Sequence, residues 1–320
     1  MAVRTLILSD LHLGRGPELP VAETIEALAP LWEDVDRLVL NGDSAEIHHP
    51  RTWGRAARCF MQLIDRCEED GVDLVVLSGN HDPWLSDRRH LTLAGGAVLV
   101  THGDVMHPAV APWSPAAGRM RQAHARAVAN LPQEIRHRLE GRLLASQHAS
   151  FAEWEDERTL QREAGGSTIT NMLLRPWSFL QVLHYWHVFP RLAADFAAEH
   201  LPDARVIVTG HTHHPGLWRV GDRTVLNTGS FIAPTRPRAV LVEGGTISLH
   251  RVARSGSAWT RDPRPLGTIA VPAPTEPALP GTVAMPEVVT AAVNGADGAA
   301  EPCSPPAPGA VPATTSDPAG

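Results

Sequence analysis

The chain has 320 residues, 43% of them hydrophobic, which is enough to bury the core of one large domain or two small ones. Its formal net charge of −7 argues against general nucleic-acid binding, because such proteins carry a basic excess that neutralises phosphates. All 28 basic residues are arginines, so a Walker-type phosphate loop and Schiff-base catalysis, which both need lysine, are excluded. With neither a signal peptide nor a run of about 18 apolar residues, the expected compartment is the cytoplasm.

The first hundred residues alternate short apolar runs, typical of buried strands, with longer amphipathic segments, typical of helices. The predicted strands are residues 5–8, 38–40, 74–77 and 98–100, and the predicted helices are residues 22–32 and 53–69. A further apolar run, residues 206–208, has the same character. This alternation predicts an α/β fold.

A polar motif follows each of these five predicted strands. The motifs are Asp10-Leu11-His12, Gly42-Asp43, Gly79-Asn80-His81-Asp82, His102-Gly103-Asp104 and Gly210-His211-Thr212-His213. Because α/β folds bind ligands at the carboxyl ends of their strands, these carboxylates and imidazoles are expected to meet at one edge. Two divalent cations held there would repel each other, so a carboxylate must bridge them, and Asp43 is the candidate.

The order and spacing of the five motifs resemble those of the calcineurin-like metallophosphoesterase superfamily. The resemblance implies an αββα sandwich, in which helices flank two β-sheets. It also implies that Asp10, His12, Asp43 and His213 hold one metal ion and that Asp43, Asn80, His102 and His211 hold the other. In the same pattern His81 is the catalytic residue that protonates the leaving oxygen. Asp82 is expected to orient a neighbouring imidazole.

The resemblance implies hydrolysis of a phosphodiester or pyrophosphate bond by attack of a metal-bound hydroxide. The cofactors are then two divalent metal ions, with Mn²⁺ as the first candidate and Fe or Zn²⁺ as alternatives, since mixed oxygen and imidazole ligands suit all of them. Two other functions stay open at this stage. One is a phosphodiesterase or phosphatase for a small nucleotide, and the other is a non-catalytic metal-binding scaffold.

Local motifs are similar to those of the UDP-2,3-diacylglucosamine pyrophosphatases. They are Ser9-Asp10-Leu11-His12-Leu13-Gly14, Gly42-Asp43-x-x-Glu46 and Thr101-His102-Gly103-Asp104, with a helical insertion behind the last. This similarity implies an amphiphilic, lipid-linked sugar nucleotide as substrate and peripheral association with the inner membrane surface. One departure is that His81 stands where many such enzymes have Arg. The oligomeric state is left open.

The insertion covers about residues 105–203 and carries no motif of the family. Helices are predicted at residues 122–129, 133–144 and 179–200. Arginines dominate its first half and aromatic residues its second half, and one interpretation is a lid that recognises a substrate with a charged head and an apolar tail. The alternative is an insertion with a small core of its own.

The C-terminal part of the sequence changes character twice. Residues 224–226, 239–242 and 247–252 are predicted to be short strands of an antiparallel sheet, and the segment Asn227-Thr228-Gly229-Ser230 is assigned a structural role. The metallophosphoesterase domain is therefore expected to span residues 1–252. Residues 253–320 are rich in Pro and Ala and are predicted to be a disordered tail.

Overall fold

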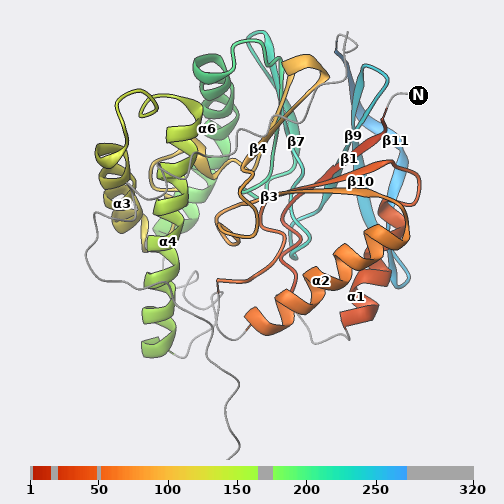
Figure 1. Ribbon diagram of the computed structural model, residues 1–320, viewed down its shortest axis with the longest axis horizontal. Coiled ribbons are helices and arrows are strands. Elements are labelled where there is room, and N and C mark those ends of the chain that lie inside the picture. The colour runs from red at the N-terminus through yellow and green to blue at the C-terminus, as the bar shows by residue number, and fades with distance from the viewer. Residues whose placement is uncertain (1–2, 16–20, 49–51, 165–175, 272–320) are drawn as a thin grey trace, which may run out of the picture.

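The structure is a computed structural model that describes residues 3–15, 21–48, 52–164 and 176–271. Within these ranges, two mixed β-sheets lie face to face and helices cover the outer face of each sheet (Figure 1). The layers therefore run helices, sheet, sheet, helices. This confirms the αββα sandwich expected from the motifs.

The first sheet has the strand order β11-β10-β9-β1-β2-β3. Its strands are β1 (Thr5–Leu8), β2 (Arg37–Asn41), β3 (Asp73–Leu77), β9 (Arg238–Glu243), β10 (Thr246–Ser255) and β11 (Ala258–Ala270). The first three are parallel to one another, whereas β9, β10 and β11 form an antiparallel extension. The parallel strands are connected by α1 (Val21–Leu28), which continues into the 3-10 helix η1 (Ala29–Leu31), and by α2 (Trp53–Glu69).

The second sheet has the strand order β4-β5-β6-β8-β7. Its strands are β4 (His90–Leu93), β5 (Val98–Thr101), β6 (Val206–Thr209), β7 (Gly216–Val220) and β8 (Arg223–Asn227). The central strands β5, β6 and β8 are parallel, and the two edge strands are antiparallel to their neighbours. Short 3-10 helices, η2 (Ala94–Gly96) and η3 (Asp104–Met106), lie before and after β5.

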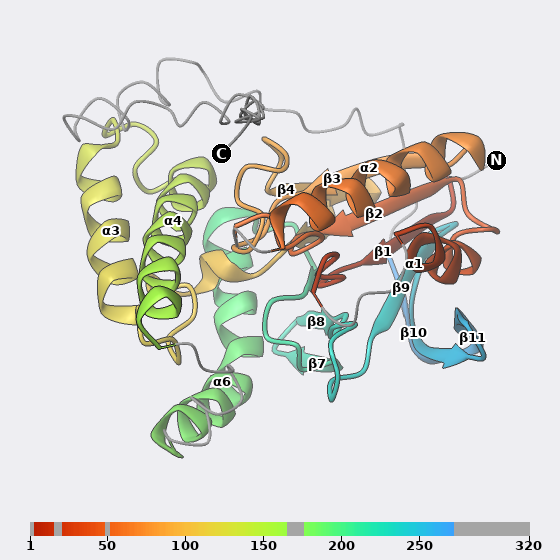
Figure 2. The ribbon, with the colours of Figure 1, turned by 90° about the horizontal axis from the view of Figure 1, so that it is seen from below.

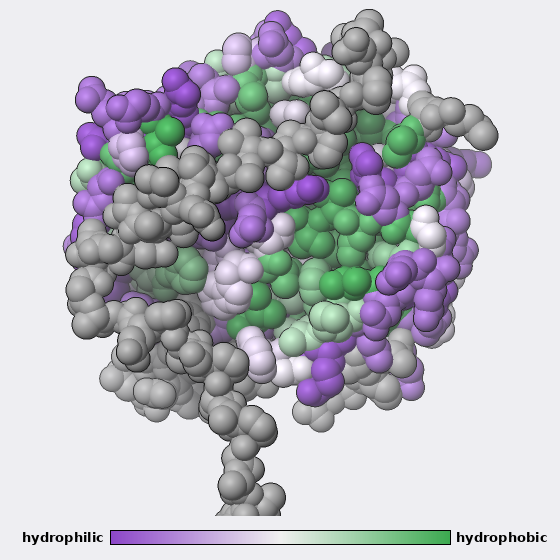
Figure 3. Space-filling view, viewed as in Figure 1, coloured by the Kyte–Doolittle hydropathy of each residue, from purple (hydrophilic) through white to green (hydrophobic). Residues whose placement is uncertain are grey.

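The two sheets enclose the central core. Buried aliphatic side chains of both sheets, such as Ile7, Val39, Val100 and Val208, form one cluster between them. The apolar face of α2, including Phe60, packs against the outer face of the first sheet. In the orientation of Figure 1, Figure 3 shows apolar surface near the middle of the molecule, with hydrophilic surface toward its rim. Parallel strands buried on both faces explain why their sequences are almost wholly apolar.

The insertion forms the outer helical layer of the second sheet. Its helices are α3 (Ala117–Asn130), α4 (Leu139–Ala164) and α6 (Pro176–His200), which lie on the side of the molecule opposite α1 and α2 (Figure 2). Phe189 and Ala193 of α6 are buried together with Leu99 and Ile207 of the sheet. A smaller separate cluster around Met120 joins α3 to α4. In the described part of the chain, none of the helices is long and apolar enough to cross a membrane.

One helix of the insertion begins later than the sequence predicts. The prediction places a helix at residues 133–144, but α4 starts at Leu139, and the preceding residues form consecutive turns. Pro132 disfavours a helical conformation at Leu131, which is extended with ψ at 144°. The side chain of Arg136 then donates to the carbonyls of Ala129 and Leu131, so these turns close the end of α3.

The predicted boundary of the tail at residue 253 is also wrong. β10 extends to Ser255, and β11 continues the sheet from Ala258 to Ala270. Proline is tolerated because β11 is an edge strand, and because the pairing with β10 shifts register between His250 and Val252, opposite Pro265 and Arg261. The ordered domain therefore reaches at least Val271. The rest of the predicted tail lies outside the described residues.

Candidate metal centre

The five polar motifs meet at one edge of the sandwich. They occupy the loops that follow β1, β2 and β3 in the first sheet and β5 and β6 in the second. The amides of Asp10 and His12 donate to the carbonyls of Gly42 and Asp43 over 3.1 and 2.9 Å. In the second sheet, the amide of Gly210 donates to the carbonyl of His102 over 2.9 Å. Neighbouring loops are thus joined through their backbones, which fixes the starting point of each side chain.

The backbone of these loops is strained at the predicted ligands. Of the seven non-glycine residues with positive φ in the described chain, five are predicted ligands. Their φ angles are 54° at Asp10, 47° at His12, 52° at Asp43, 65° at His211 and 55° at His213. Side chains other than glycine rarely adopt this left-handed region, and such strain is concentrated at functional sites.

Two motif glycines allow the ligands to approach the neighbouring loops closely. A Cβ atom added to Gly79 would lie 2.3 Å from Asp43 Oδ1, and one added to Gly210 would lie 2.2 Å from Asp10 Oδ2. Any side chain at these positions would displace a predicted ligand. The glycines that begin two of the motifs are therefore required by the packing of the carboxylates.

Four predicted ligands form a first group around Asp10. Donor atoms of Asp10, His12, Asp43 and His213 all lie within 4.8 Å of one another. His213 Nε2 lies 3.1 Å from both Asp10 Oδ1 and His12 Nε2. His12 Nε2 lies 4.0 Å from Asp43 Oδ2. Two carboxylates and two imidazoles at this spacing can coordinate one divalent cation.

Asp43 also faces the remaining predicted ligands. His102 Nε2 lies 3.1 Å from Asp43 Oδ2, and His211 Nδ1 lies 2.9 Å from Asn80 Oδ1. The rings of His102 and His211 are in edge contact, with centroids 5.3 Å apart. The structure therefore brings all seven predicted ligands together, with Asp43 between two groups.

The side chains in both groups fit divalent metal ions. Carboxylate, amide and imidazole donors suit Mn²⁺, Fe and Zn²⁺ alike. The buried Nε2 of His102 makes no hydrogen bond with any described residue, although it is directed toward Asp43. A buried nitrogen without a hydrogen bond is costly, and a cation that displaced the proton of this ring would use the lone pair of Nε2.

Burial and mutual charge set the protonation of these ligands. Burial alone would raise the pKa of Asp43, but the imidazoles of His102 and His81 hold it well below its usual range. Burial opposes the charge of His102, yet Asp43 raises the pKa of His102 to about 10. Burial and His102 lower the pKa of His211 to about 4. His211 is therefore neutral at pH 7, whereas His102 carries a proton that a cation must displace.

Three of the histidines predicted to be ligands are oriented by hydrogen bonds to the ring nitrogen that faces away from the site. His12 Nδ1 lies 2.7 Å from Glu46 Oε1, and His102 Nδ1 lies 2.9 Å from the carbonyl of Asn41. His211 Nε2 lies 3.1 Å from the carbonyl of Val110, a residue of the insertion. Such bonds fix the tautomer and leave the opposite ring nitrogen for a metal ion.

Glu46 is a site residue that the sequence interpretation missed. Its carboxylate is buried and lies between His12 and His81, with the second oxygen 3.2 Å from His81 Nδ1. Burial would raise the pKa of Glu46, but these two imidazoles keep it well below its usual range. The Gly42-Asp43-x-x-Glu46 motif contained the signal, although it was used only to compare subfamilies.

Asp82 has a different role from the one expected. Its carboxylate accepts hydrogen bonds from the backbone amides of Asp43, Ser44 and Gly79 over 3.1, 2.6 and 2.7 Å. Those amides belong to two motif loops, so Asp82 holds the loops together, and the imidazole of His81 is oriented by Glu46 instead. Burial and the charge of Asp43 raise the pKa of Asp82 to about 6.

His81 lies beside the two ligand groups and reaches the surface. Its backbone N–H donates to Asp43 Oδ1 over 2.8 Å, and its side chain is 25% exposed. Burial would lower the pKa of His81, but Glu46 and Asp43 raise it well above its usual value. A protonated imidazole at the mouth of the site can donate a proton to a reacting oxygen.

The segment Asn227-Thr228-Gly229-Ser230 supports the motif loops, in agreement with its predicted structural role. The Asn227 amide donates to the carbonyl of Gly210 over 2.6 Å, and Ser230 Oγ donates to the carbonyl of Asp10 over 3.2 Å. Both acceptors belong to motifs that carry predicted ligands. These bonds couple the end of β8 to the loops of both sheets.

The fold and this site together define a class: an α/β sandwich with carboxylates and imidazoles clustered at the edge of its sheets. The calcineurin-like phosphoesterase family matches residues 3–215, and the chain belongs to it. The matched range includes all seven predicted ligands, His81 and Glu46. No curated protein sequence matches the chain.

The solved structures that match the chain are distant in sequence. Yfce, a phosphoesterase from E. coli, is 16% identical, with 84% of this chain and 99% of that chain covered and a TM-score of 0.38. A predicted phosphoesterase from Streptococcus pneumoniae is 15% identical, with coverage of 82% and 99% and a TM-score of 0.33. Vps29 from Chaetomium thermophilum is 12% identical, with coverage of 85% and 100% and a TM-score of 0.40.

Proposed function

We propose that this protein is a binuclear metal-dependent phosphoesterase that hydrolyses a phosphodiester or pyrophosphate bond. The observation that carries the proposal is the position of Asp43, whose carboxylate is shared between the two groups of donor atoms. Asp10, His12, Asp43 and His213 would hold one metal ion, and Asp43, Asn80, His102 and His211 the other. When bound, the two cations supply a hydroxide from water and neutralise charge on the phosphoryl oxygens.

His81 is the proposed proton donor to the leaving oxygen. Glu46 engages Nδ1 of its ring, so Nε2 is the atom that can donate to a substrate. The raised pKa keeps this imidazole protonated at neutral pH. Once the P–O bond breaks, the proton passes from Nε2 to the departing oxygen, and Glu46 stabilises the cationic ring until that transfer.

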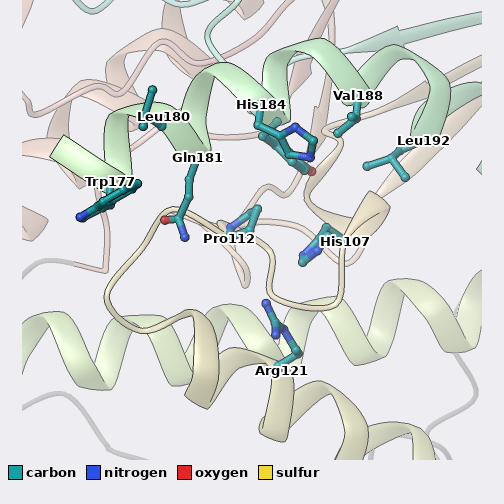
Figure 4. A pocket seen from close by; sticks show the side chains of 10 residues that line it. His107, Pro112, Arg121, Trp177, Leu180, Gln181, His184, Val188 and Leu192 are labelled. Atoms are coloured by element: carbon teal, nitrogen blue, oxygen red, sulfur yellow. The ribbon is translucent and has the colours of Figure 1, made fainter. Parts of the chain in front are cut away.

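A cavity in the insertion supports an amphiphilic substrate. It has a volume of about 450 Å³ and lies between α6, α3 and the loop that precedes α3. Figure 4 shows Leu180, Val188 and Leu192 along one wall, with Arg121 reaching toward them from the opposite helix. Tyr185, another lining residue, has its ring 6.4 Å from that of His211. We propose that the cavity takes the apolar part of a lipid-linked sugar nucleotide whose phosphates lie on the metal ions.

The first turns of α6 support contact with a membrane surface, from which such a substrate would be drawn. Trp177, Phe179, Leu180 and Leu183 are all exposed there. Exposed apolar side chains gathered on one helix can enter the interface of a bilayer without spanning it. We therefore propose peripheral association through this end of α6.

The test is metal stoichiometry combined with a substrate panel. Purified protein loaded with Mn²⁺ is expected to bind two ions per chain and to hydrolyse a nitrophenyl phosphodiester. Replacing Asp43 by Ala should abolish both, because it removes the carboxylate between the two cations. Asp87→Asn, a change at an exposed carboxylate, is the control.

The panel should contain phosphodiesters, phosphomonoesters, free nucleotides and lipid-linked nucleotide-sugar diphosphates. Preference for the lipid-linked diphosphate supports the proposed substrate, whereas turnover confined to small nucleotides overturns it. Two bound metals without turnover of any phosphoester would assign the protein to the scaffold class. Retention of two metal ions in Asp43→Ala would refute the bridging role of Asp43.

A further inference from the structure

Glu153 brings a carboxylate from the helical insertion to the metal centre. It lies on α4, 73 residues beyond Asn80 in the sequence, yet its Oε2 is 3.5 Å from the side-chain nitrogen Nδ2 of Asn80. It is also one of the acidic groups whose charge raises the pKa of His81. A residue of the insertion therefore faces the loop that carries both a proposed metal ligand and the proposed proton donor.

Two contacts fix α4 against this loop, and a third joins it to the loop after β5. Gln147 Nε2 donates to the carbonyl of Pro83 over 2.6 Å, and the rings of Trp84 and Phe151 are stacked with centroids 5.4 Å apart. Ser146 Oγ donates to Asp104 Oδ2 over 2.7 Å. The contacts lie between Ser146 and Phe151, about one and a half turns of α4, and Glu153 lies about half a turn beyond Phe151. The position of its carboxylate is thus set by the packing of the helix against the loop.

We propose that Glu153 is a positioning residue for the metal ligand Asn80. A side-chain amide has an oxygen and a nitrogen of nearly equal size at its two ends, and only the oxygen can bind a cation. Asn80 Oδ1 is directed into the site, 2.9 Å from His211 Nδ1, while Nδ2 faces Glu153. A flipped amide would direct its NH₂ group at the metal and its oxygen at a carboxylate. Glu153 therefore selects the orientation that can bind metal.

The arrangement repeats, on the second group of ligands, what Glu46 does for the first. Glu46 contacts Nδ1 of His12, the ring nitrogen turned away from the proposed metal ion. Glu153 contacts Nδ2 of Asn80, which is likewise turned away from it. Partners of this kind raise the affinity of a site by fixing its ligands. The insertion is then a component of the metal centre and not only a cover for the substrate.

This inference rests on the proposed two-metal site, and the experiment separates the two. Full-length protein freed of metal is titrated with Mn²⁺ by calorimetry, as wild type and as the variants Glu153→Ala, Glu153→Gln and Glu155→Ala. Glu155 is an exposed acid on the same helix and serves as the matched control. Thermal unfolding of the metal-free proteins tests whether each variant is folded, and Mn²⁺ EPR reports the spin coupling of an intact pair.

In Glu153→Ala the second Mn²⁺ is expected to bind about tenfold more weakly or worse, with the first unchanged and the spin-coupled signal reduced. Glu153→Gln should bind like wild type, because its amide oxygen can accept the same hydrogen bond. Wild-type affinity in Glu153→Ala overturns the inference, as does equal weakening of both metal ions or failure of Gln to rescue. Wild-type protein that binds fewer than two Mn²⁺ overturns the proposed function instead.

Discussion

Glu46 Oε1 lies 2.7 Å from Nδ1 of His12, and the other oxygen of the same carboxylate lies 3.2 Å from Nδ1 of His81. One buried acid therefore contacts both a proposed metal ligand and the proposed proton donor. In His12 it fixes the tautomer that directs Nε2 at the metal. In His81 it favours the protonated ring, because its charge opposes the effect of burial.

Replacing Glu46 by Gln is expected to reduce metal affinity and activity by about tenfold or more, because one amide oxygen cannot serve both His12 and His81 and the loss of such a partner typically has this size. The pH profile should change as well. With the negative charge gone, the pKa of His81 falls, so the decline of kcat at high pH should begin at a lower pH than in wild type. Rates measured at saturating Mn²⁺ across pH check this. An unshifted decline would show that His81 is not the group that titrates.

Removing the imidazole of His81 should affect chemistry but not metal binding. We expect His81→Ala to keep two metal ions and to lower kcat by about 10²- to 10⁴-fold for substrates with poor leaving groups. The loss should be smaller for nitrophenolate, which leaves without a proton. Comparing kcat for alkyl and nitrophenyl diesters provides the measurement. An equal loss for both would mean that His81 binds the phosphate and does not act as the acid.

The fold could be predicted best where the hydrophobic pattern is strong. Strand β1 and helix α2 were predicted at residues 5–8 and 53–69, which are their observed bounds. The strands that the sequence did not reveal, β4, β7 and β11, are all edge strands. An edge strand has few buried side chains, so it lacks the apolar run that marks a central strand. In β11 the prolines also suggested disorder, although an edge position tolerates them.

The sequence predicted the central residues of the site but not the acidic side chains that contact them. The motifs identified all seven side chains that the structure brings together, because each follows a strand and the strand ends are adjacent. Glu46 and Glu153 were missed because their partners lie on other loops, far away in the sequence, and only the folded chain brings them close. Asp82 was assigned to a neighbouring imidazole on the basis of sequence proximity, whereas its carboxylate reaches the backbone of two loops.

Metal binding at neutral pH should release protons. In the absence of metal, Asp43 raises the pKa of His102 to about 10 against the effect of burial, so this ring is protonated at pH 7. A cation needs the lone pair on Nε2 and must displace that proton. Metal affinity is therefore expected to increase as pH rises toward 10. Calorimetry at pH 7 in buffers with different ionisation enthalpies should show a binding heat that depends on the buffer, and a heat that does not would contradict it.

Asp82→Asn should destabilise the motif loops. In the wild type, the backbone N–H groups of Ser44 and Gly79 donate to the Asp82 carboxylate. The Asn side chain would direct its NH₂ group at one or more of these donors. Leaving such buried donors unpaired costs about 1–3 kcal/mol each, so we expect the free energy of unfolding to fall by about 3 kcal/mol. Chemical denaturation of the metal-free protein measures this free energy. Asp87→Asn, at an exposed position, is the matched control and should leave the free energy of unfolding unchanged.

The proposed role of the apolar cavity in substrate binding can be tested by placing a charged side chain in its lining. Leu180 lines the cavity beside α3, whereas Leu183 is exposed on the same helix and lines a different hollow. Leu180→Glu should raise KM for a water-soluble, short-chain lipid-linked diphosphate by about tenfold, because losing contact with even two methylene groups costs about 1.6 kcal/mol. It should leave hydrolysis of a small diester unchanged. Leu183→Glu should not alter KM for the same soluble substrate, but both variants should bind lipid vesicles more weakly if this end of α6 meets the membrane. An unchanged KM in Leu180→Glu would show that the apolar part of the substrate lies elsewhere.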